Sequence, residues 1–476
     1  MTTSIVWFRQ DLRINDNPAL KAACDNGKVI PVYILDESAP EKAQLGGASK
    51  WWLHHALNDL ADSFEQQLIV EQGDAKEILH RLADEFNATH VLWNRMYEPW
   101  ARERDADIKS SFKDSNVVAK SLNGSLLWEP WEISKKDGGP YKVYTPYYRK
   151  GCLNHSEPRY PLDRPEIQCH NKVKKEAKSQ IDKLKLLPDI PWDKTMREFW
   201  TVSEKAAGSK LHWFLNNAIT EYKDQRNLPA VRGTSQLSPY LHFGQISPNQ
   251  VWYAIKDAFH GNTSGEGVDT YMSELGWREF SYHLLYHFDD IQKRNFNDKF
   301  NDFPWRSSDK DLKAWQKGQT GVPIVDAGMR ELWQTGYMHN RVRMIVGSFL
   351  VKNLLLDWRK GERWFWDCLV DADTASNSAS WQWVAGCGAD AAPYFRIFNP
   401  VLQGEKFDKE GEYVKQYCPE LKKLPKKYIH KPWEAPQDVL EEANVSLGKD
   451  YPEPIVDLKD SRKRALDAFD QIKGSN

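Results

Sequence analysis

The sequence lacks the patterns that mark several protein classes. Its six cysteines are scattered and show no CxxC or CxxH spacing, so they indicate neither a zinc site nor a disulfide framework, and we expect no bound metal. No apolar run approaches the length of a membrane span, and charged residues follow the N-terminal apolar run too early for a signal peptide. We therefore expect a soluble, cytoplasmic protein.

An excess of positive charge is also missing. The 65 Lys and Arg residues stand against 67 Asp and Glu residues, which leaves a formal net charge of -2. This excludes a protein that coats nucleic acid by bulk charge, but it allows a local basic groove, because attraction to phosphates depends on where the charges cluster. Aromatic residues, in contrast, are abundant, with 21 Trp, 19 Tyr and 19 Phe. Most of them must form core, so any functional role belongs to particular positions.

The length of 476 residues exceeds the size at which one hydrophobic core stops growing, so we expect two domains. Up to about residue 131, short apolar runs alternate with amphipathic stretches, which predicts an α/β domain with a parallel, Rossmann-like sheet. Neither GxGxxG nor GxxxxGK[ST] follows the first strand, so the common nucleotide-binding loops are absent. The expected strands are 4–8, 28–36, 67–73 and 90–94, and the expected helices between them are 17–27, 49–66 and 74–86.

The rest of the chain has a different character. Residues 132–195 are irregular and rich in Gly, Pro, Tyr and Lys, which predicts a long ordered connector. Residues 196–476 show helical periods without strand-like alternation, so we expect an all-α domain there. The expected helical stretches are 208–227, 247–259, 269–288, 311–316, 324–336, 340–370 and 461–473.

Short hydroxyl residues cluster in "RGTSQLSPYLHFGQISP", residues 232–248. Thr234, Ser235 and Ser238 lie beside a Gly and before a Pro, and such a turn offers N–H and hydroxyl donors to phosphate oxygens. A cluster of helix caps, with Ser238 and Ser247 each before a Pro, explains the same residues.

The segment "SELGWREF" places Glu274, Trp277 and Arg278 at helical spacing. One interpretation is an exposed ion pair between Glu274 and Arg278, worth roughly 0.3–0.5 kcal/mol. The other is that a carboxylate, a flat ring and a cation line one wall of a pocket.

A second basic segment, "YMHNRVRM", contains Asn340, Arg341, Arg343 and Met344 within two helical turns. Arg341 and Arg343 would face different sides of a helix, so one could meet an external phosphate while the other points to an internal one. A solvated basic helix end is the alternative.

The segment "DADTASNSASWQWVAG" combines two carboxylates with two tryptophans on either side of a glutamine. Asp371 and Asp373 have no His or third acid nearby in sequence, which favours binding of hydroxyl or N–H groups over hydrolysis or a metal. If residues 374–386 are helical, Trp381 and Trp383 lie about 200° apart and face different surroundings.

These segments, together with "VWFRQDLRINDNPAL" and "PYFRIFNPVLQGEKFD", resemble the photolyase/cryptochrome family from Ile5 to about Leu421. Within the family, the sequence is most similar to bacterial cyclobutane pyrimidine dimer photolyases. The resemblance implies an α/β antenna domain, a connector and a helical domain that holds FAD in a U-shape.

The resemblance also assigns residues. Asn377 matches the residue beside the flavin nitrogen that gains and loses a proton, where Asn is typical of photolyases. The residues assigned to FAD are Tyr222, Thr234, Ser235, Gln236, Leu237, Ser238, Arg278, Asn340, Arg343, Asp371, Asp373 and Asn377.

Further residues match the lesion pocket and an electron-transfer chain. A protonated Glu274 could donate a hydrogen bond to the flipped dimer, and Trp383 would stack against it. Trp381, Trp358 and Trp305 match the chain that passes electrons from the surface to the flavin. The residues assigned to the dimer or to DNA are Arg226, Glu274, Trp277, Asn340, Arg341, Met344, Trp383 and Arg396.

The resemblance therefore implies a monomeric enzyme that binds UV-damaged DNA and splits pyrimidine dimers with light. A cryptochrome-type blue-light photoreceptor is the alternative, and a flavoprotein without DNA is disfavoured by Arg226, Arg341 and Arg396. The sequence lacks the Cys-Lys antenna contact of some enterobacterial relatives. Methenyltetrahydrofolate is the favoured antenna, with a deazaflavin second.

Overall fold

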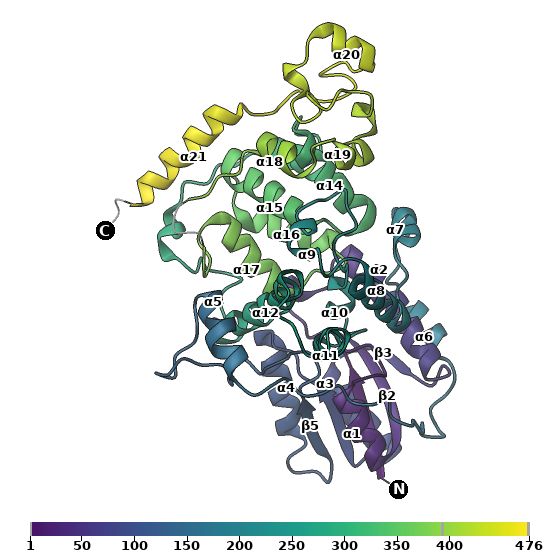
Figure 1. Ribbon diagram of the computed structural model, residues 1–476. Helices are drawn as coiled ribbons and strands as arrows, with labels where there is room; N and C mark the ends of the chain where they lie inside the picture. The colour runs from purple at the N-terminus through teal and green to yellow at the C-terminus, as the bar shows by residue number, and fades with distance from the viewer. Residues whose placement is uncertain (1, 392–394, 474–476) are drawn as a thin grey trace. The chain divides into compact units, whose positions relative to one another are not determined.

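The computed structural model describes residues 2–391 and 395–473, so the quoted stretch "PYFRIFNP" lies partly outside the described residues. The chain divides into two compact units (Figure 1). Unit 1 comprises Met1–Asn217 and Ser235–Asp289, and unit 2 comprises Ala218–Thr234 and Asp290–Asn476. The domain limits expected from the sequence, 1–131, 132–195 and 196–476, stay a prediction. Across the described ranges, no helix has the length and apolar character needed to span a membrane.

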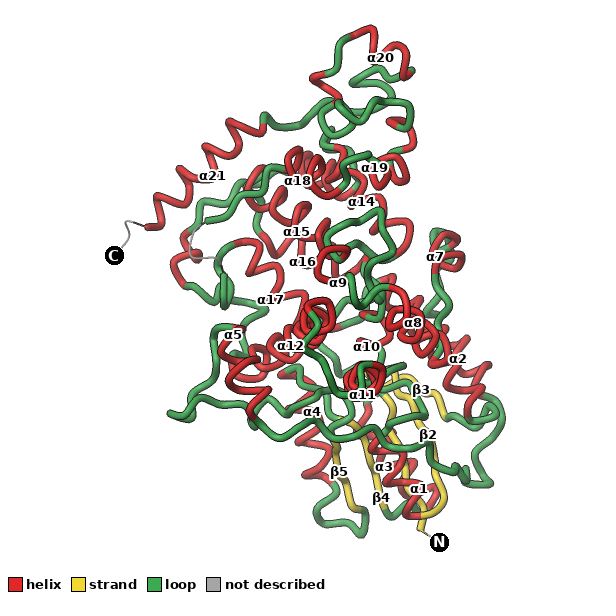
Figure 2. The backbone as a smooth tube through the Cα atoms, viewed as in Figure 1, coloured by secondary structure: helices red, strands yellow, loops and turns green. Residues whose placement is uncertain are grey.

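Unit 1 contains a five-stranded parallel sheet in the order β3-β2-β1-β4-β5 (Figure 2). This confirms the predicted α/β class with a parallel sheet. The fifth strand was not expected, because only Ser121 of its five residues is buried and the strand has no apolar run. The strands are β1 (Thr2–Phe8), β2 (Gly27–Asp36), β3 (Ile69–Gly73), β4 (His90–Asn94) and β5 (Val118–Leu122).

Helices cover both faces of this sheet. Parallel connections are right-handed, so the reversal of strand order at β1 places α3 on the opposite face from α1. Ile5 and Trp7 of β1 pack with α3 and α4, and α1 contacts β1, β2 and β4 on the other face (Figure 1). These helices are α1 (Pro18–Asn26), α2 (Gly47–Ser63), α3 (Ala75–Phe86) and α4 (Pro99–Ser111).

Unit 1 also contains shorter helices and helical turns, some of them in the connector predicted at residues 132–195 and some outside it. The 3-10 turn η1 (Glu41–Ala43) precedes α2, and α11 begins with a capping box in which Ser247 accepts the Gln250 N–H. The first residue of α10 is Ser238, so Ser238 does not cap that helix. The remaining helical elements of unit 1 are α5 (Tyr144–Pro146), η2 (Tyr147–Gly151), η3 (Cys152–Asn154), α6 (Ala177–Lys183), α7 (Lys194–Phe199), α8 (Glu204–Asn217), α10 (Ser238–His242), α11 (Pro248–Ala258) and α12 (Glu266–His287).

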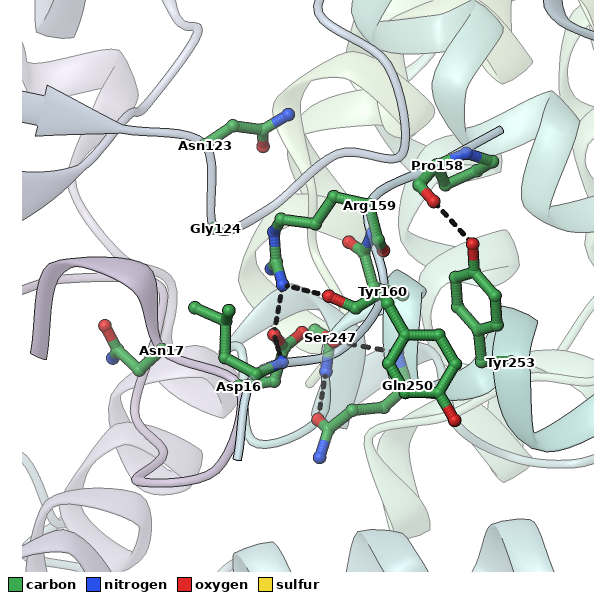
Figure 3. A network of polar contacts seen from close by, with 12 residues as sticks. Asp16, Asn17, Asn123, Gly124, Pro158, Arg159, Tyr160, Ser247, Gln250 and Tyr253 are labelled. Atoms are coloured by element: carbon green, nitrogen blue, oxygen red, sulfur yellow. Dashed lines mark hydrogen bonds and ion pairs between the residues drawn. The ribbon is translucent and has the colours of Figure 1, made fainter. Parts of the chain in front are cut away.

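A buried carboxylate, Asp16, joins three separate segments of unit 1 (Figure 3). Its carboxylate accepts hydrogen bonds from Arg159 of the connector, from the Leu162 N–H and from the hydroxyl of Ser247, which caps α11. Asp16 is fully buried, so these partners offset the cost of removing its charge from water. The α/β sheet, the connector and α11 are thereby held in one unit.

Every regular element among the described residues of unit 2 is a helix or a helical turn, which confirms the predicted helical class of the C-terminal part. The expected run 340–370 is interrupted, because Leu355 adopts a left-handed φ of 58° between the π-turn η5 and α16. Its helical elements are α9 (Tyr222–Gln225), η4 (Asp298–Asp302), α13 (Asp309–Gln316), α14 (Pro323–Thr335), α15 (Asn340–Ser348), η5 (Phe349–Asn353), α16 (Trp358–Cys368), α17 (Thr374–Ala385), α18 (Pro400–Phe407), α19 (Glu412–Tyr417), η6 (Pro419–Leu421), η7 (Pro432–Glu434), α20 (Gln437–Ala443) and α21 (Leu458–Lys473).

Candidate functional site

The helix α17 separates the two tryptophans as the sequence predicted. It begins where the Asp373 carboxylate accepts the Ser376 N–H at 2.7 Å, and it ends at Gly386 with a left-handed φ of 92°. Trp381 is buried with 4% of its surface exposed, whereas Trp383 is half-buried. The two rings therefore meet different surroundings.

Gln382, between the two tryptophans, has a structural role that the sequence did not reveal. Its fully buried side chain accepts the Phe296 N–H at 2.8 Å and donates to the carbonyls of Ile291 at 2.6 Å and Arg294 at 3.0 Å. The amide thus satisfies three backbone groups of the 291–296 loop. It fixes the rotation of α17, and with it the directions of both neighbouring rings.

The three tryptophans of the predicted electron-transfer chain differ in exposure. Trp358 is fully buried and donates its indole N–H to Asn295 Oδ1 at 2.9 Å. Trp381 packs edge-on against Phe365 with ring centroids 4.9 Å apart. Trp305 is only half-buried and contacts the ring of Phe303 at 4.4 Å. Of these three rings, Trp358 and Trp381 are enclosed and Trp305 reaches solvent.

A partly buried ion pair joins α15 to the segment before α17. Arg343 donates to both oxygens of Asp371, at 3.1 and 2.9 Å, and to the Met338 carbonyl at 2.7 Å. Burial by itself lowers the pKa of Arg343, but the Asp371 carboxylate, together with Tyr337 and Glu331, outweighs it, so the pKa of the guanidinium is raised. Asp371 and Asp373 thus both lie in the segment immediately before α17. Among the described residues, no group of three or more His, Cys, Asp or Glu side chains could hold a metal ion.

Asn377 is buried on the first turn of α17. Its amide nitrogen donates to the Glu362 carbonyl at 3.0 Å. Within the described part of the chain, the amide oxygen of Asn377 has no hydrogen-bond donor. This oxygen is held in place and can accept a hydrogen bond from the N–H group of a ligand. A flavin ring carries such an N–H group.

The start of α15 holds a histidine that the sequence analysis missed. The Nδ1 atom of His339 accepts the Arg341 N–H, and its Nε2 atom is buried without a partner among the described residues. Burial, with the charges of Arg341, Arg343 and Arg226, lowers the pKa of His339 to about 3, so the ring is neutral and Nε2 carries the proton. An unpaired buried donor beside guanidiniums suits an external acceptor such as a phosphate oxygen.

Glu331 of α14 holds the same helix end in place. Its Oε2 atom accepts the His339 N–H at 3.1 Å and the Tyr413 hydroxyl at 2.5 Å. Burial raises the pKa of Glu331 to about 7. Nothing in the local sequence marked Glu331, because its partners come from two other helices.

Guanidiniums gather at the surface of unit 2. Arg341 donates to Asn227 Oδ1 at 2.5 Å, lies 4.5 Å from the Phe407 ring centroid, and has a buried Nε with no partner in the described ranges. Burial lowers the pKa of Arg341, as do the charges of Arg226 and Arg396, so the three cations lie near one another. Asn340 is exposed and Met344 is half-buried on the same helix. This group forms the local basic patch that the net charge allowed.

The other predicted cofactor residues lie in the chain segment 222–238, which contributes to both units. Tyr222 is buried, and the side chains of Thr234 and Tyr337 share a hydrogen bond within unit 2. In unit 1, Ser235 accepts the Tyr271 hydroxyl at 3.0 Å. Gln236 has a left-handed φ of 52° and accepts from Lys210 at 3.0 Å, and Leu237 is buried just before Ser238.

The helix α12 presents Glu274, Trp277 and Arg278 on one half-buried face of unit 1. Arg278 donates to the Ser125 carbonyl at 2.8 Å and contacts Glu279 at 3.2 Å. Burial raises the pKa of Glu279 to about 7. Arg278 is thus tied to the loop after β5, which differs from the exposed ion pair with Glu274 that was one interpretation of the sequence. The pocket-wall interpretation stays a prediction.

Comparisons with known proteins identify the class. The family model for the FAD binding domain of DNA photolyase matches residues 271–471, and the DNA photolyase model matches residues 4–166. The chain belongs to the photolyase/cryptochrome family, which confirms the family predicted from its motifs.

Individual relatives are similar over almost the whole chain. The deoxyribodipyrimidine photo-lyase of Agrobacterium fabrum is 51% identical and covers 98% of each chain. Cryptochrome-2 of Arabidopsis thaliana is 37% identical over 99% of this chain and 79% of its own. The crystal structure of a class III photolyase from Agrobacterium tumefaciens superimposes with a TM-score of 0.95 at 49% identity, and covers 100% of this chain and 98% of that one.

Proposed function

We propose that this chain is a deoxyribodipyrimidine photo-lyase, an FAD-dependent enzyme that uses light to split cyclobutane pyrimidine dimers in DNA. The observation that carries this function is the near-full-length similarity to a photo-lyase at 51% identity, against 37% to a cryptochrome. The helical fold and the FAD-binding family model agree with it. The rival is a cryptochrome-type photoreceptor.

The described residues fit FAD. The partly buried pair of Arg343 and Asp371 offers charged groups to a ligand with N–H, hydroxyl and phosphate groups. The Asn377 amide oxygen and the His339 Nε2 atom, which have no partner among the described residues, offer an acceptor and a donor. When bound and reduced, FAD supplies the excited-state electron that opens the dimer. We assign its binding to Tyr222, Thr234, Ser235, Gln236, Leu237, Ser238, Arg278, Asn340, Arg343, Asp371, Asp373 and Asn377.

The protein's own side chains would bind the dimer and the DNA backbone and would carry electrons to the flavin. Glu274 would donate a hydrogen bond to the dimer, and Trp277 and Trp383 would stack against the unpaired bases. Asn340, Arg341 and Met344 would complete the contacts, and Arg226 and Arg396 would meet backbone phosphates. Trp381, Trp358 and Trp305 would carry electrons inward from solvent, since only Trp305 is half-exposed.

An antenna chromophore is part of the proposal, with methenyltetrahydrofolate favoured and a deazaflavin second. Parallel sheets usually bind ligands at the carboxyl edge of the strands. At that edge Arg104 contacts Asp36 at 2.7 Å and lies 4.7 Å from the Trp7 ring centroid and 4.8 Å from that of Trp100. The absorption spectrum of the purified protein distinguishes the two compounds.

The location and assembly of the enzyme complete the proposal. We propose a cytoplasmic monomer. All six cysteines are free, as a reducing compartment requires.

Binding to damaged DNA tests the function directly. Matched duplexes with and without one dimer should differ in affinity, and light should remove the dimer. Trp383→Ala should cost about 1–3 kcal/mol on the damaged duplex only, the usual contribution of stacking one base on an aromatic ring. Arg396→Ala should instead weaken both duplexes and reduce the salt slope by at most one phosphate contact, about 0.9 in log K per log salt.

A salt series with both variants measures these slopes. A wild-type protein that binds the two duplexes equally and leaves the dimer intact in light would favour the photoreceptor.

Glu274 and Arg341 should separate catalysis from binding. Glu274→Ala should lower the repair yield per flash more than the affinity, because its hydrogen bond strengthens as negative charge develops on the dimer. Arg341→Ala should lower the affinity more than the yield, because its guanidinium belongs to the basic patch. Binding isotherms and single-flash yields measure the two effects, and the opposite ranking would contradict both roles.

A further inference from the structure

Behind Trp277, unit 1 contains a stack of parallel rings built from the connector. Tyr144 lies against Trp277 with ring centroids 3.8 Å apart and planes 12° apart. Tyr148 stacks on Tyr144 at 5.7 Å and 9°, and the guanidinium of Arg149 lies 5.3 Å from the Tyr148 ring centroid. Aromatic pairs at such distances contribute beyond the area that they bury. One face of Trp277 is thus covered by a layered support.

The stack is fastened to α12 at both ends. The Tyr144 hydroxyl donates to the Ser273 carbonyl at 2.6 Å, one turn before Trp277. Arg149 forms a two-pronged pair with Asp269 of the same helix, at 2.7 and 2.5 Å. The helix can approach this closely because residue 276 is glycine, where a Cβ atom would lie 2.5 Å from Tyr148 and 2.8 Å from the Tyr144 hydroxyl.

The supporting rings are enclosed, whereas Trp277 is not. Tyr144 is 6% exposed and Tyr148 is 1% exposed, while Trp277 is half-buried. Burial raises the pKa of Tyr144, so its phenol keeps the proton that Ser273 accepts. Enclosed rings with fixed hydrogen bonds have little rotational freedom, so they determine the plane of the ring that lies on them.

We propose that Tyr144 is a positioning residue for lesion recognition, which holds the Trp277 ring in the plane that a flipped pyrimidine dimer stacks on. The inference rests on the proposed function of Trp277. The Tyr-rich connector is then part of the lesion-binding wall, and the ring of Tyr144, more than its hydroxyl, supplies the effect. Selectivity for damaged DNA depends on a residue that does not touch the DNA.

The test uses the flavin-containing protein and compares affinities for matched duplexes with and without one dimer. Tyr144→Leu should reduce the ratio of the two affinities by about three- to tenfold, the range that an aromatic pair supplies. The loss should come from the damaged duplex alone. Tyr144→Phe, which keeps the ring, should retain most of the ratio. Tyr141→Leu is the matched control, because Tyr141 contacts Tyr147 and His283 of the same region.

A double-mutant cycle shows whether Tyr144 acts through Trp277. With Trp277 already replaced by leucine, Tyr144→Leu should have no further effect on the ratio. Flavin content and the melting temperature establish folding, and Tyr144→Met replaces the leucine variant if that variant does not retain flavin. An unchanged ratio, equal losses on both duplexes, or losses that add in the cycle would overturn the inference. A wild-type protein without any preference for the dimer would overturn the proposed function, and the inference with it.

Discussion

Replacing Trp305 by phenylalanine should abolish the photoreduction of oxidised flavin, while repair by protein that was reduced chemically in advance should stay nearly intact. Trp358 and Trp381 are 0% and 4% exposed, so Trp305 is the member of the chain that can take an electron from a donor in solution. A phenyl ring fills most of the same space but is far harder to oxidise than indole. Bleaching of the oxidised flavin spectrum under blue light and dimer repair after dithionite treatment measure the two activities.

The control for this result is Trp131→Phe, which changes another accessible tryptophan, 45% exposed, in unit 1. It should alter neither activity. Equal loss of both activities in the pre-reduced Trp305 variant would show that Trp305 supports the fold or the repair step instead of refilling the flavin.

Asp371→Ala should release most of the flavin and lower the free energy of unfolding by about 3 kcal/mol, the lower end of the usual cost of breaking a buried ion pair. The change leaves the Arg343 guanidinium, whose side chain is 24% exposed, without the carboxylate that it contacts at 2.9 Å. It also removes one of the polar groups assigned to the cofactor. The ratio of flavin to protein absorbance and a urea titration measure the two effects.

The matched control removes a carboxylate from an exposed pair. Asp470 contacts Lys473 at 3.0 Å with both side chains more than 60% exposed, so Asp470→Ala should leave stability and flavin content nearly unchanged. Asp371→Asn, which keeps an acceptor for Arg343, should lie between the two. Full flavin content in Asp371→Ala would remove this residue from the cofactor site.

Local patterns predicted many of the helices and strands, but the expected segments did not include β5, α4, α6 or the helices α18 to α20. Strand β5 has one buried residue, and α6 is seven residues long, so neither has enough apolar residues for a visible period. The helical run at 340–370 was predicted as continuous because apolar residues persist through the π-turn at Phe349–Asn353. The residues around this turn belong to the hydrophobic core, so they are apolar whether or not the helix continues, and the sequence pattern does not show the interruption.

The sequence by itself determined the class of the protein and the chemistry that its residues offer. The separation of Trp381 from Trp383 follows from helical geometry over a few residues, and the structure agrees with it. Such features depend only on neighbours within about one turn of the chain.

Only the tertiary structure decided which groups support the candidate site. Glu331 reaches His339 and Tyr413, Gln382 holds a loop some ninety residues earlier, at Ile291, and Tyr144 bonds to Ser273 129 residues further along the chain. Each of these side chains is ordinary in its local sequence. Their partners lie far away in the sequence and are brought close by the packing of helices and strands. A local hydrophobic period cannot predict such contacts, so the roles of these residues became visible only in the folded chain.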